Sequence, residues 1–358
     1  MEDQGSDCFC VHDPPEVLAR TKDKKTWMIE CDVCHIWFHG DCVKLSKVIV
    51  PTIEKFHCPK CKPLCGPSIS KVVTNSHRYD PTDPEAKSKA VQIGTRDFIH
   101  DQLGHKSFAS DSCVLKEMTG YRVNKYWLER NGFNAPVKFF HAEGLGLTVP
   151  ESFGPQSLLD HLDPERPVEV IDVYKQGSVE MDLQDFLAVY ASPTPGDPLN
   201  SLSLEVSDTP LDELIGPPNL VRELCWIQTL WKTPFPSYPA PKVQKYCILS
   251  MAHSYTDFHI DFGGSSVWYH MVSGVKKFYL FSPSTNNVAN FERWHKLHNQ
   301  SEIFLPDMMS DACYCTELTA GQTLLIPTGW IHAVYTVENS VVIGGNFLHS
   351  LNIPLQLR

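Results

Sequence analysis

The chain has 358 residues, of which 42% are hydrophobic and 20% are charged, so it is long enough for two or more domains. It contains no run of about eighteen uncharged apolar residues, and the acidic, polar start MEDQGSD is not typical of a signal peptide, so we expect neither a membrane span nor a secretion signal. A net charge of −11 argues against a broad DNA-binding surface and is compatible with a basic peptide as partner.

The first part of the chain is rich in cysteine. With one histidine, seven of the thirteen cysteines form four close pairs of ligand residues: Cys8 and Cys10, Cys31 and Cys34, His39 and Cys42, Cys58 and Cys61. Eight such ligands suffice for two tetrahedral zinc sites, and without a secretion signal clustered cysteines favour metal over disulfides. A segment this short buries little core, so zinc is expected to supply its folding free energy. We therefore predict a zinc-binding domain at residues 1–64.

The order of these ligands, with Trp37 and Phe38 just ahead of His39, resembles the plant homeodomain (PHD) finger. The main alternative is a RING domain. The resemblance implies cross-braced sites. One zinc would be held by Cys8, Cys10, His39 and Cys42, and the other by Cys31, Cys34, Cys58 and Cys61. The single residue between Cys8 and Cys10 departs from the usual two.

Many PHD fingers hold methylated lysine in an aromatic cage by cation–π attraction. The resemblance places Trp37 and Met28 where cage members stand, although a core position is the alternative for Trp37. Related fingers carry tyrosine where this chain has Asp7, and the loop VHDPPEVLARTKDKK contains no aromatic residue. We therefore expect Asp7 to favour a lower methylation state, whose ammonium retains an N–H to donate.

Residues 65–90 are polar and rich in proline, which is typical of a linker that runs into a helix. In residues 91–242, DFIHDQL, NKYWLERNGF, SLLDHLD and DLQDFLAVYAS have helical spacing, whereas VEVIDV and LNSLSLEV alternate like strands. Thr209-Pro210 predicts a helix start before LDELI. We expect this mixed region to pack on the domain that follows.

Residues 243–358 are predicted to contain strands only. The strand-like runs are VQKYCILSMA, SSVWYHMV, KKFYLFS, SEIFL, CYCTEL, TLLIP, IHAVYTV and SVVIGGNFL, separated by short turn signals. About eight short strands at this spacing predict a jelly roll or cupin-like barrel, not a parallel sheet. The expected fold class is α+β but mostly β: a small zinc finger, then a jelly-roll domain with flanking helices.

Within this region, TDFHIDFGG places a histidine and a carboxylate two residues apart. On a strand, His259 and Asp261 would point to the same face. His332 follows at the point where a Pro-Thr-Gly turn leads into a strand, and a packed core histidine is its alternative. Two histidines and one carboxylate form the facial triad of non-haem iron oxygenases, which leaves positions open for oxygen and a cosubstrate.

The motifs SYTDFHIDFGG, SVWYH, VQKYC, PTGWIHAV and GGNFLHSLNI resemble the JmjC-domain 2-oxoglutarate oxygenases. The finger followed by these motifs resembles the PHD-finger branch of the JmjC histone lysine demethylases. The resemblance implies Fe(II) on His259, Asp261 and His332, and the distal carboxylate of 2-oxoglutarate on Thr256 and Lys276 with Tyr269 and Asn200 assisting. It also implies that Tyr246 and Asn346 line the methyl-lysine pocket, where ordinary packing is the alternative.

Two of these positions can also be judged from the residues themselves. A dicarboxylate needs a fixed cation, and Lys276 and Lys277 lie on an otherwise apolar strand with side chains on opposite faces. Periodicity does not choose between them, and the resemblance selects Lys276. Thr256 is three residues from His259, so a regular strand would place it on the wrong face. We therefore predict a bulge between Thr256 and His259.

The resemblance implies a nuclear enzyme that uses Fe(II), 2-oxoglutarate and two Zn(II). It would demethylate mono- and dimethylated lysines of histone H3, the ninth and twenty-seventh, while its finger reads the H3 tail on the nucleosome. No sequence-specific DNA binding is expected. The alternatives are a JmjC protein hydroxylase and a non-catalytic chromatin reader. Cys313 and Cys315 with His295 and His298 are a weaker candidate for a third zinc site.

Overall fold

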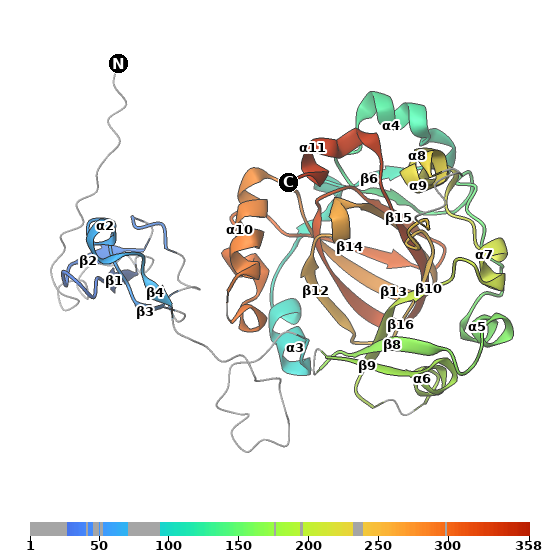
Figure 1. Cartoon of the computed structure of the whole chain (residues 1–358), viewed down its shortest axis with the longest axis horizontal. Helices are drawn as coiled ribbons and strands as arrows, with labels where there is room; N and C mark the ends of the chain where they lie inside the picture. Colours follow the sequence, from blue (N-terminus) through green and yellow to red (C-terminus); the bar gives the residue numbers. More distant parts are fainter. Residues whose placement is uncertain are drawn as a thin grey trace. The chain divides into compact units, whose positions relative to one another are not determined.

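The structure is a computed structural model that describes residues 27–40, 42–45, 50, 53–70, 94–174, 177–193, 196–231, 239–297 and 299–358 (Figure 1). Its internal contacts divide the chain into two compact units, Met1–His77 with Arg293–Met308, and Arg78–Glu292 with Met309–Arg358. We call the second the JmjC-like unit, after the motifs it contains. None of the described helices is long and apolar enough to cross a membrane.

The cysteine-rich segment is built from short hairpins. Its elements are β1 (Met28–Glu30), β2 (Trp37–His39), β3 (Ile53–Lys55), α2 (Lys62–Cys65) and β4 (Ile69–Ser70), and the strands pair antiparallel as β1–β2 and β3–β4. The buried apolar core among its described residues consists of Phe56 and the three cysteines Cys31, Cys58 and Cys61. Burial of so few side chains contributes little, so the arrangement is expected to depend on metal binding.

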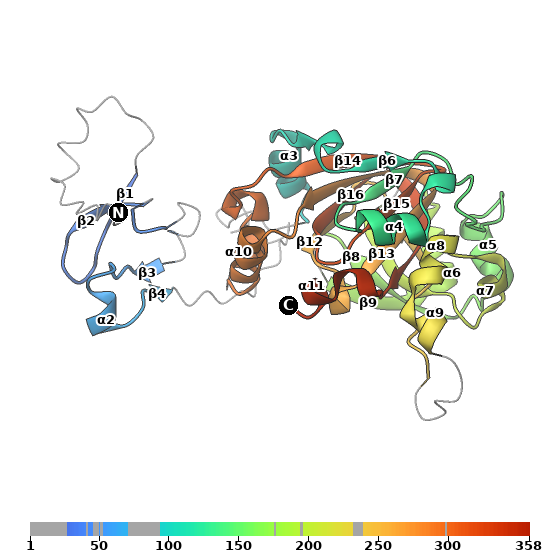
Figure 2. The same ribbon diagram turned by 90° about the horizontal axis from the view of Figure 1, so that it is seen from above.

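A mixed sheet of twelve strands lies at the centre of the JmjC-like unit. The strand order is β6–β7–β15–β13–β16–β11–β10–β8–β9, with β12 paired to β16 and β14 paired to both β13 and β5. The order ends at β6 and β9, so the sheet fits the predicted jelly roll but does not close into a barrel (Figures 1 and 2). The bounds are β5 (Ala109–Ser110), β6 (Lys116–Met118), β7 (Val137–Phe139), β8 (Pro167–Asp172), β9 (Gly177–Asp182), β10 (Leu199–Glu205), β11 (Tyr246–Ser250), β12 (Tyr255–His259), β13 (Ser266–Phe281), β14 (Tyr314–Thr319), β15 (Thr323–Ile326) and β16 (Ile331–Phe347).

Two long strands take the place of four predicted short ones. SSVWYHMV and KKFYLFS both lie on β13, and IHAVYTV and SVVIGGNFL both lie on β16. The two strands pair along nearly their whole length, with register shifts between Met271 and Lys276. Gly274 lies in this irregular stretch at φ 82°, and a Cβ there would come within 2.3 Å of the Asn339 carbonyl oxygen. The glycine therefore permits a bulge in a continuous strand where a turn was expected.

Helices flank the sheet. In Figures 1 and 2, α4 lies beside α8 and α9, and α6 lies beside α5 and the hairpin of β8 and β9. The predicted start of α7 is confirmed, because Thr209 Oγ1 accepts a hydrogen bond from the Leu211 N–H and Pro210 opens the helix. The bounds are α3 (Arg96–Gly104), α4 (Lys125–Asn131), α5 (Pro155–His161), α6 (Leu183–Tyr190), α7 (Pro210–Leu214), α8 (Asn219–Leu224), α9 (Trp226–Leu230), α10 (Thr285–His295) and α11 (Ile353–Gln356).

The prediction that residues after 243 form only strands was wrong, because the described residues there also form α10, α11 and four short 3-10 helices. The run SEIFL forms parts of two short 3-10 helices, Gln300–Glu302 and Leu305–Met308. The segment before it forms α10, whose start is fixed by Ser284 Oγ, which accepts a hydrogen bond from the Asn287 N–H. Val288 and Trp294 are buried, and with the partly buried Phe291 between them they follow in steps of three residues. The capping signal and this spacing were both present in the sequence.

Candidate active site and metal centres

The structure brings His259, Asp261 and His332 together. One ligand atom from each lies within 4.8 Å of the others, and His332 Nε2 is 3.8 Å from Asp261 Oδ2. His259 ends β12 and pairs with His332 near the start of β16. Asp261 is not on the strand as predicted, because β12 ends at His259; it reaches the site from the turn before the 3-10 helix Phe262–Gly264.

Backbone carbonyls orient both imidazoles. His259 Nδ1 lies 2.8 Å from the Asp257 carbonyl oxygen, and His332 Nδ1 lies 3.1 Å from that of Trp330. Because a carbonyl only accepts, each Nδ1 carries the hydrogen and each Nε2 keeps its lone pair.

The environment of His332 also suits a metal ligand. Its side chain is fully buried, and its Nε2 has no hydrogen-bond partner among the described residues. Burial, and then the neighbouring His259, lower the pKa of His332 to about 4, so the ring is neutral near pH 7. A buried neutral imidazole with an unpaired nitrogen beside a carboxylate fits a divalent metal ion.

Asn346, predicted for the methyl-lysine pocket, also contacts a residue of the triad. Its Nδ2 donates to Ser265 Oγ at 2.9 Å and to Asp261 Oδ1 at 3.4 Å. One oxygen of the Asp261 carboxylate is thereby oriented, and the other faces His332. Asn346 therefore orients the carboxylate of a candidate metal ligand and also lines the cavity.

The predicted bulge between Thr256 and His259 is confirmed. Thr256 pairs with Val334 and His259 pairs with His332, so three steps along β12 are matched by two along β16. The extra residue brings Thr256 onto the wall of the same cavity as His259. Asn200 lies behind that wall, and its Nδ2 donates to Thr256 Oγ1 at 3.3 Å.

Lys276 is 4% exposed and reaches the cavity from β13. Its Nζ donates to Ser250 Oγ at 2.7 Å and to Thr336 Oγ1 at 3.1 Å, and Ser250 Oγ donates in turn to Asn200 Oδ1 at 2.7 Å. Burial lowers the pKa of Lys276 to about 7. Lys277, on the opposite face, is partly exposed. A buried amine whose described partners are neutral hydroxyls suits an incoming carboxylate.

One cavity of about 280 Å³ joins these groups. Its polar side includes Thr256, His259, Asp261 and Lys276, and Tyr269 and Tyr246 lie on its wall. Its apolar side chains are Leu202, Ile248, Phe262, Val267, Phe278, Val334 and Val342. Since most of these belong to the apolar cluster inside the sheet, the cavity places two of the three candidate metal ligands and the amine of Lys276 against apolar walls.

Sequence reasoning missed Ser250 and Thr336, the two partners of Lys276. Each is a fully or nearly fully buried polar residue on a largely apolar strand, which was the available signal. Their convergence depends on the pairing of β11 with β16 and of β16 with β13, which residue spacing does not reveal.

A buried Ser-His pair also lies in the JmjC-like unit. Ser266 Oγ is 2.8 Å from His349 Nε2, but the Leu351 N–H donates to His349 Nδ1, so Nε2 carries the hydrogen and donates to Ser266. The Thr328 N–H also donates to Ser266 Oγ. His349 therefore does not act as a base toward this serine, and the cluster joins the end of β16 to β13.

In the finger, Cys31, Cys34, Cys58 and Cys61 gather with their sulfurs within 4.8 Å of one another. These are the four residues that the resemblance assigns to one zinc. The Cys58 N–H donates to Cys31 Sγ at 3.3 Å. Burial opposes ionisation of Cys31, but backbone N–H groups outweigh it and lower its pKa to about 6, which favours the thiolate that binds zinc.

Of the other predicted zinc ligands, His39 and Cys42 lie close together, with Nδ1 and Sγ 3.9 Å apart. Cys8 and Cys10 lie outside the described residues, as do Asp7, the loop VHDPPEVLARTKDKK and most of the predicted linker 65–90.

The two predicted cage residues lie on the same face of a hairpin. In the pairing of β1 with β2, Met28 is opposite His39 and Glu30 is opposite Trp37. Because alternate residues share a face, Met28 and Trp37 project from the same side as diagonal neighbours. Both are partly exposed, as is required of a cage that binds a side chain of another molecule from solution.

The weaker candidate for a third zinc site has no support among the residues that the structure describes. Among the described residues, Cys313, Cys315 and His295 do not converge as a group of metal ligands. His298 lies outside the described residues.

Two family models match the chain. A PHD-finger model matches residues 8–61, and a model described as "JmjC domain, hydroxylase" matches residues 246–347. The chain therefore contains a PHD finger and a JmjC domain, and the three residues of the triad lie within the segment that the JmjC model matches.

Three curated relatives from Danio rerio extend the similarity over nearly the whole chain. Lysine-specific demethylase 7A is 44% identical over 344 residues, and lysine-specific demethylase 7B is 44% identical over 352 residues. Histone lysine demethylase PHF8 is 42% identical over 339 residues. These matches cover 96%, 98% and 94% of this chain but 39%, 59% and 32% of the respective relatives, so the chain spans only part of their length.

Proposed function

We propose that the chain is an Fe(II)- and 2-oxoglutarate-dependent histone lysine demethylase. One observation carries the proposal: the unpaired Nε2 of His332 meets Asp261 and His259 at a cavity that also contains the buried amine of Lys276. The first group of residues fits a metal, and the second fits an organic carboxylate. The relatives named as lysine demethylases support the same reaction.

His259, Asp261 and His332 would hold the iron, and Asn346 would orient the Asp261 carboxylate. Lys276 and Thr256 would bind the distal carboxylate of 2-oxoglutarate, with Tyr269 and Asn200 in support. When bound, iron and 2-oxoglutarate supply the oxidation that releases a lysine methyl group as formaldehyde.

The remaining residues position the substrate. We assign Tyr246, whose hydroxyl donates to the Lys242 carbonyl oxygen at 3.3 Å, and Asn346 to the pocket for the methylated lysine. The apolar side chains of the cavity would exclude water from the reacting methyl group. The substrates we propose are mono- and dimethylated lysines of histone H3, at its ninth and twenty-seventh positions.

The finger is proposed to read the histone H3 tail on the nucleosome, in the nucleus. Trp37 and Met28, on one face of the β1–β2 hairpin, would contact the tail. Two zinc ions would hold this face in place. One would be bound by the gathered cysteines Cys31, Cys34, Cys58 and Cys61, and one by His39 and Cys42 together with Cys8 and Cys10.

Mass spectrometry tests the reaction. Mono-, di- and trimethylated H3 peptides would be incubated with the chain, Fe(II), 2-oxoglutarate and ascorbate, with His332→Ala as the control. Loss of a methyl mass that the variant does not produce supports the demethylase and ranks its sites. A stable gain of one oxygen would instead establish a protein hydroxylase, the alternative that the JmjC model's description favours. Binding without any mass change would leave a non-catalytic reader.

A further inference from the structure

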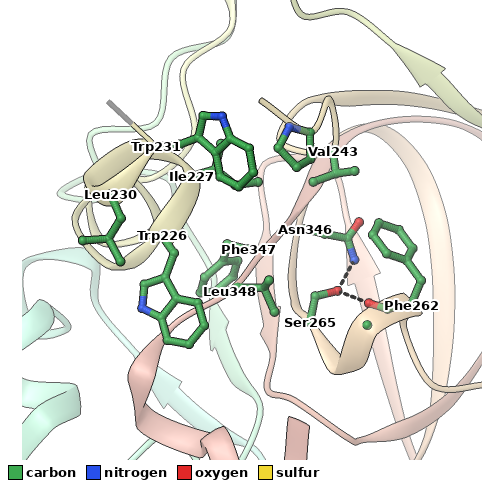
Figure 3. A pocket seen from close by; sticks show the side chains of 12 residues that line it. Trp226, Ile227, Leu230, Trp231, Val243, Phe262, Ser265, Asn346, Phe347 and Leu348 are labelled. Atoms are coloured by element: carbon green, nitrogen blue, oxygen red, sulfur yellow. Dashed lines mark hydrogen bonds between the residues drawn. The ribbon is translucent and has the colours of Figure 1, made fainter. Parts of the chain in front are cut away.

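An apolar groove of about 690 Å³ lies in the JmjC-like unit, and its lining residues are drawn in Figure 3. Trp226, Ile227 and Leu230 of α9 form one wall, and Phe347 and Leu348 at the end of β16 form another. No ionisable residue lines the groove among the described residues. It is therefore unsuited to a charged side chain, which would lose its hydration without gaining a partner.

The groove and the metal-binding cavity share two lining residues, Phe262 and Asn346. Phe262 directly follows the triad residue Asp261 and is 57% exposed. Ser265 holds the two together, because its Oγ accepts from Asn346 Nδ2 and donates to the Phe262 carbonyl oxygen, each at 2.9 Å (Figure 3). The groove is therefore adjacent to the cavity that His259 and Asp261 line.

Large apolar side chains remain exposed along this groove. Leu230 is 66% exposed and Trp231 is 42% exposed, in addition to Phe262. Exposed apolar residues that cluster in a concave site, unlike single ones, mark a binding surface. The continuity of this surface with the triad indicates that its ligand is the same molecule that delivers the methylated lysine.

We propose that the groove binds a bulky aliphatic side chain of the peptide substrate, two residues from the methylated lysine. The inference rests on the proposed demethylase reaction, not on the choice of histone H3 lysines as its substrates. In an extended peptide, side chains two residues apart point to the same side at roughly 7 Å spacing. Two adjoining hollows that share Phe262 and Asn346 in their walls provide places for two such side chains. A lysine or arginine at the same position is disfavoured by the uncharged walls.

A peptide series tests the position and chemistry of this contact. The parent carries dimethyl-lysine with alanine at the second residue on each side. Leucine or lysine replaces each alanine in turn, and leucine beside the dimethyl-lysine serves as the positional control. We expect leucine at one of the two second positions to raise kcat/KM by about tenfold, as filling an apolar pocket does. Leucine beside the methylated lysine should give no such gain, and lysine should lower kcat/KM below that of the parent.

A pair of matched variants tests the place of the contact. Leu230→Gln makes a groove residue polar, and Tyr126→Gln changes a residue of similar exposure, 68%, on α4 outside the groove. The readout is the ratio of kcat/KM between the leucine and alanine peptides. Leu230→Gln should reduce an advantage of about tenfold to about threefold or less, whereas Tyr126→Gln should preserve it.

The outcomes separate this inference from the proposed function. Turnover of all peptides without a preference for leucine overturns the inference and leaves the demethylase intact. If no peptide is turned over, fluorescence polarisation of the same labelled peptides decides: a leucine-dependent affinity that Leu230→Gln removes supports the groove. A concentration-dependent dimer that Leu230→Gln abolishes and the peptides do not displace would assign the groove to a second copy of the chain.

Discussion

Replacing Lys276 by methionine should stabilise the JmjC-like unit in the absence of 2-oxoglutarate and abolish its stabilisation by that cosubstrate. The amine is almost completely buried with only neutral hydroxyls as its described partners. Methionine has a similar length and no charge, so it removes the cost of burying the amine while filling the same space. The variant thus loses the amine proposed to bind 2-oxoglutarate and gains free energy of unfolding.

The size of the effect follows from the pKa of Lys276, which falls from 10.5 to about 7 on folding. The unfolded chain binds the additional proton, so the wild-type free energy of unfolding rises with pH between about 7 and 10.5. The cost to the folded state is about 4 kcal/mol at pH 7 and about 2 kcal/mol at pH 9. Loss of the hydrogen bonds to Ser250 and Thr336 offsets about 1 kcal/mol each. The expected net gain is therefore about 2 kcal/mol at pH 7 and near zero at pH 9.

Thermal unfolding followed by circular dichroism measures this gain. A gain of this size corresponds to a rise in Tm of roughly 4–8 °C at pH 7 for a domain of this length. Lys277→Met, on the opposite face of β13, is the control and should leave Tm and the response to 2-oxoglutarate unchanged. An unchanged or lower Tm of Lys276→Met at pH 7, or a gain that does not shrink toward pH 9, would refute the reasoning.

Three further outcomes are expected. A bound carboxylate raises the pKa of Lys276 again, so above pH 7 the binding of 2-oxoglutarate takes up a proton and its Kd rises up to about tenfold per pH unit. Calorimetry in two buffers at pH 8 should detect this proton, and its absence would contradict the assignment. Cys61→Ser should remove one of the proposed two zinc ions, measured by elemental analysis, and leave the JmjC-like unit's Tm unchanged; loss of no zinc would exclude Cys61 as a ligand. Ser266→Ala leaves two buried donors, on His349 and Thr328, without an acceptor, which should cost about 2–3 kcal/mol in chemical denaturation; a cost near zero would show that the cluster is not structural.

The sequence located the triad but not the way in which Asp261 reaches it. Spacing of two residues correctly grouped His259 with Asp261, although β12 ends at His259 and the turn completes the site. The bulge before His259 could also be predicted, because Thr256 could reach the same cavity only with an extra residue. Such predictions succeed when the residues involved are neighbours along one segment.

Predictions failed where local patterns were ambiguous or where distant strands had to be aligned. SEIFL is a short apolar run, and such runs do not distinguish a strand from a helical turn. Lys276 and Lys277 could not be separated by spacing, and the partners Ser250 and Thr336 lie on other strands. Their meeting depends on strand register, which follows from packing of the whole sheet rather than from any one segment.

The pairing of β13 with β16 also fixes the distance along the strands between the backbone positions of His332 and Lys276. His332 and Thr336 are four residues apart on β16, and their partners Leu280 and Lys276 are equally spaced on β13, so the backbone positions of His332 and Lys276 are separated along the strands by roughly 13 Å. Hydrogen bonding between the two strands resists stretching of that interval. Under the proposed function, a dicarboxylate would occupy the part of this interval that the side chains of the triad and of Lys276 leave open, so its length should affect its affinity.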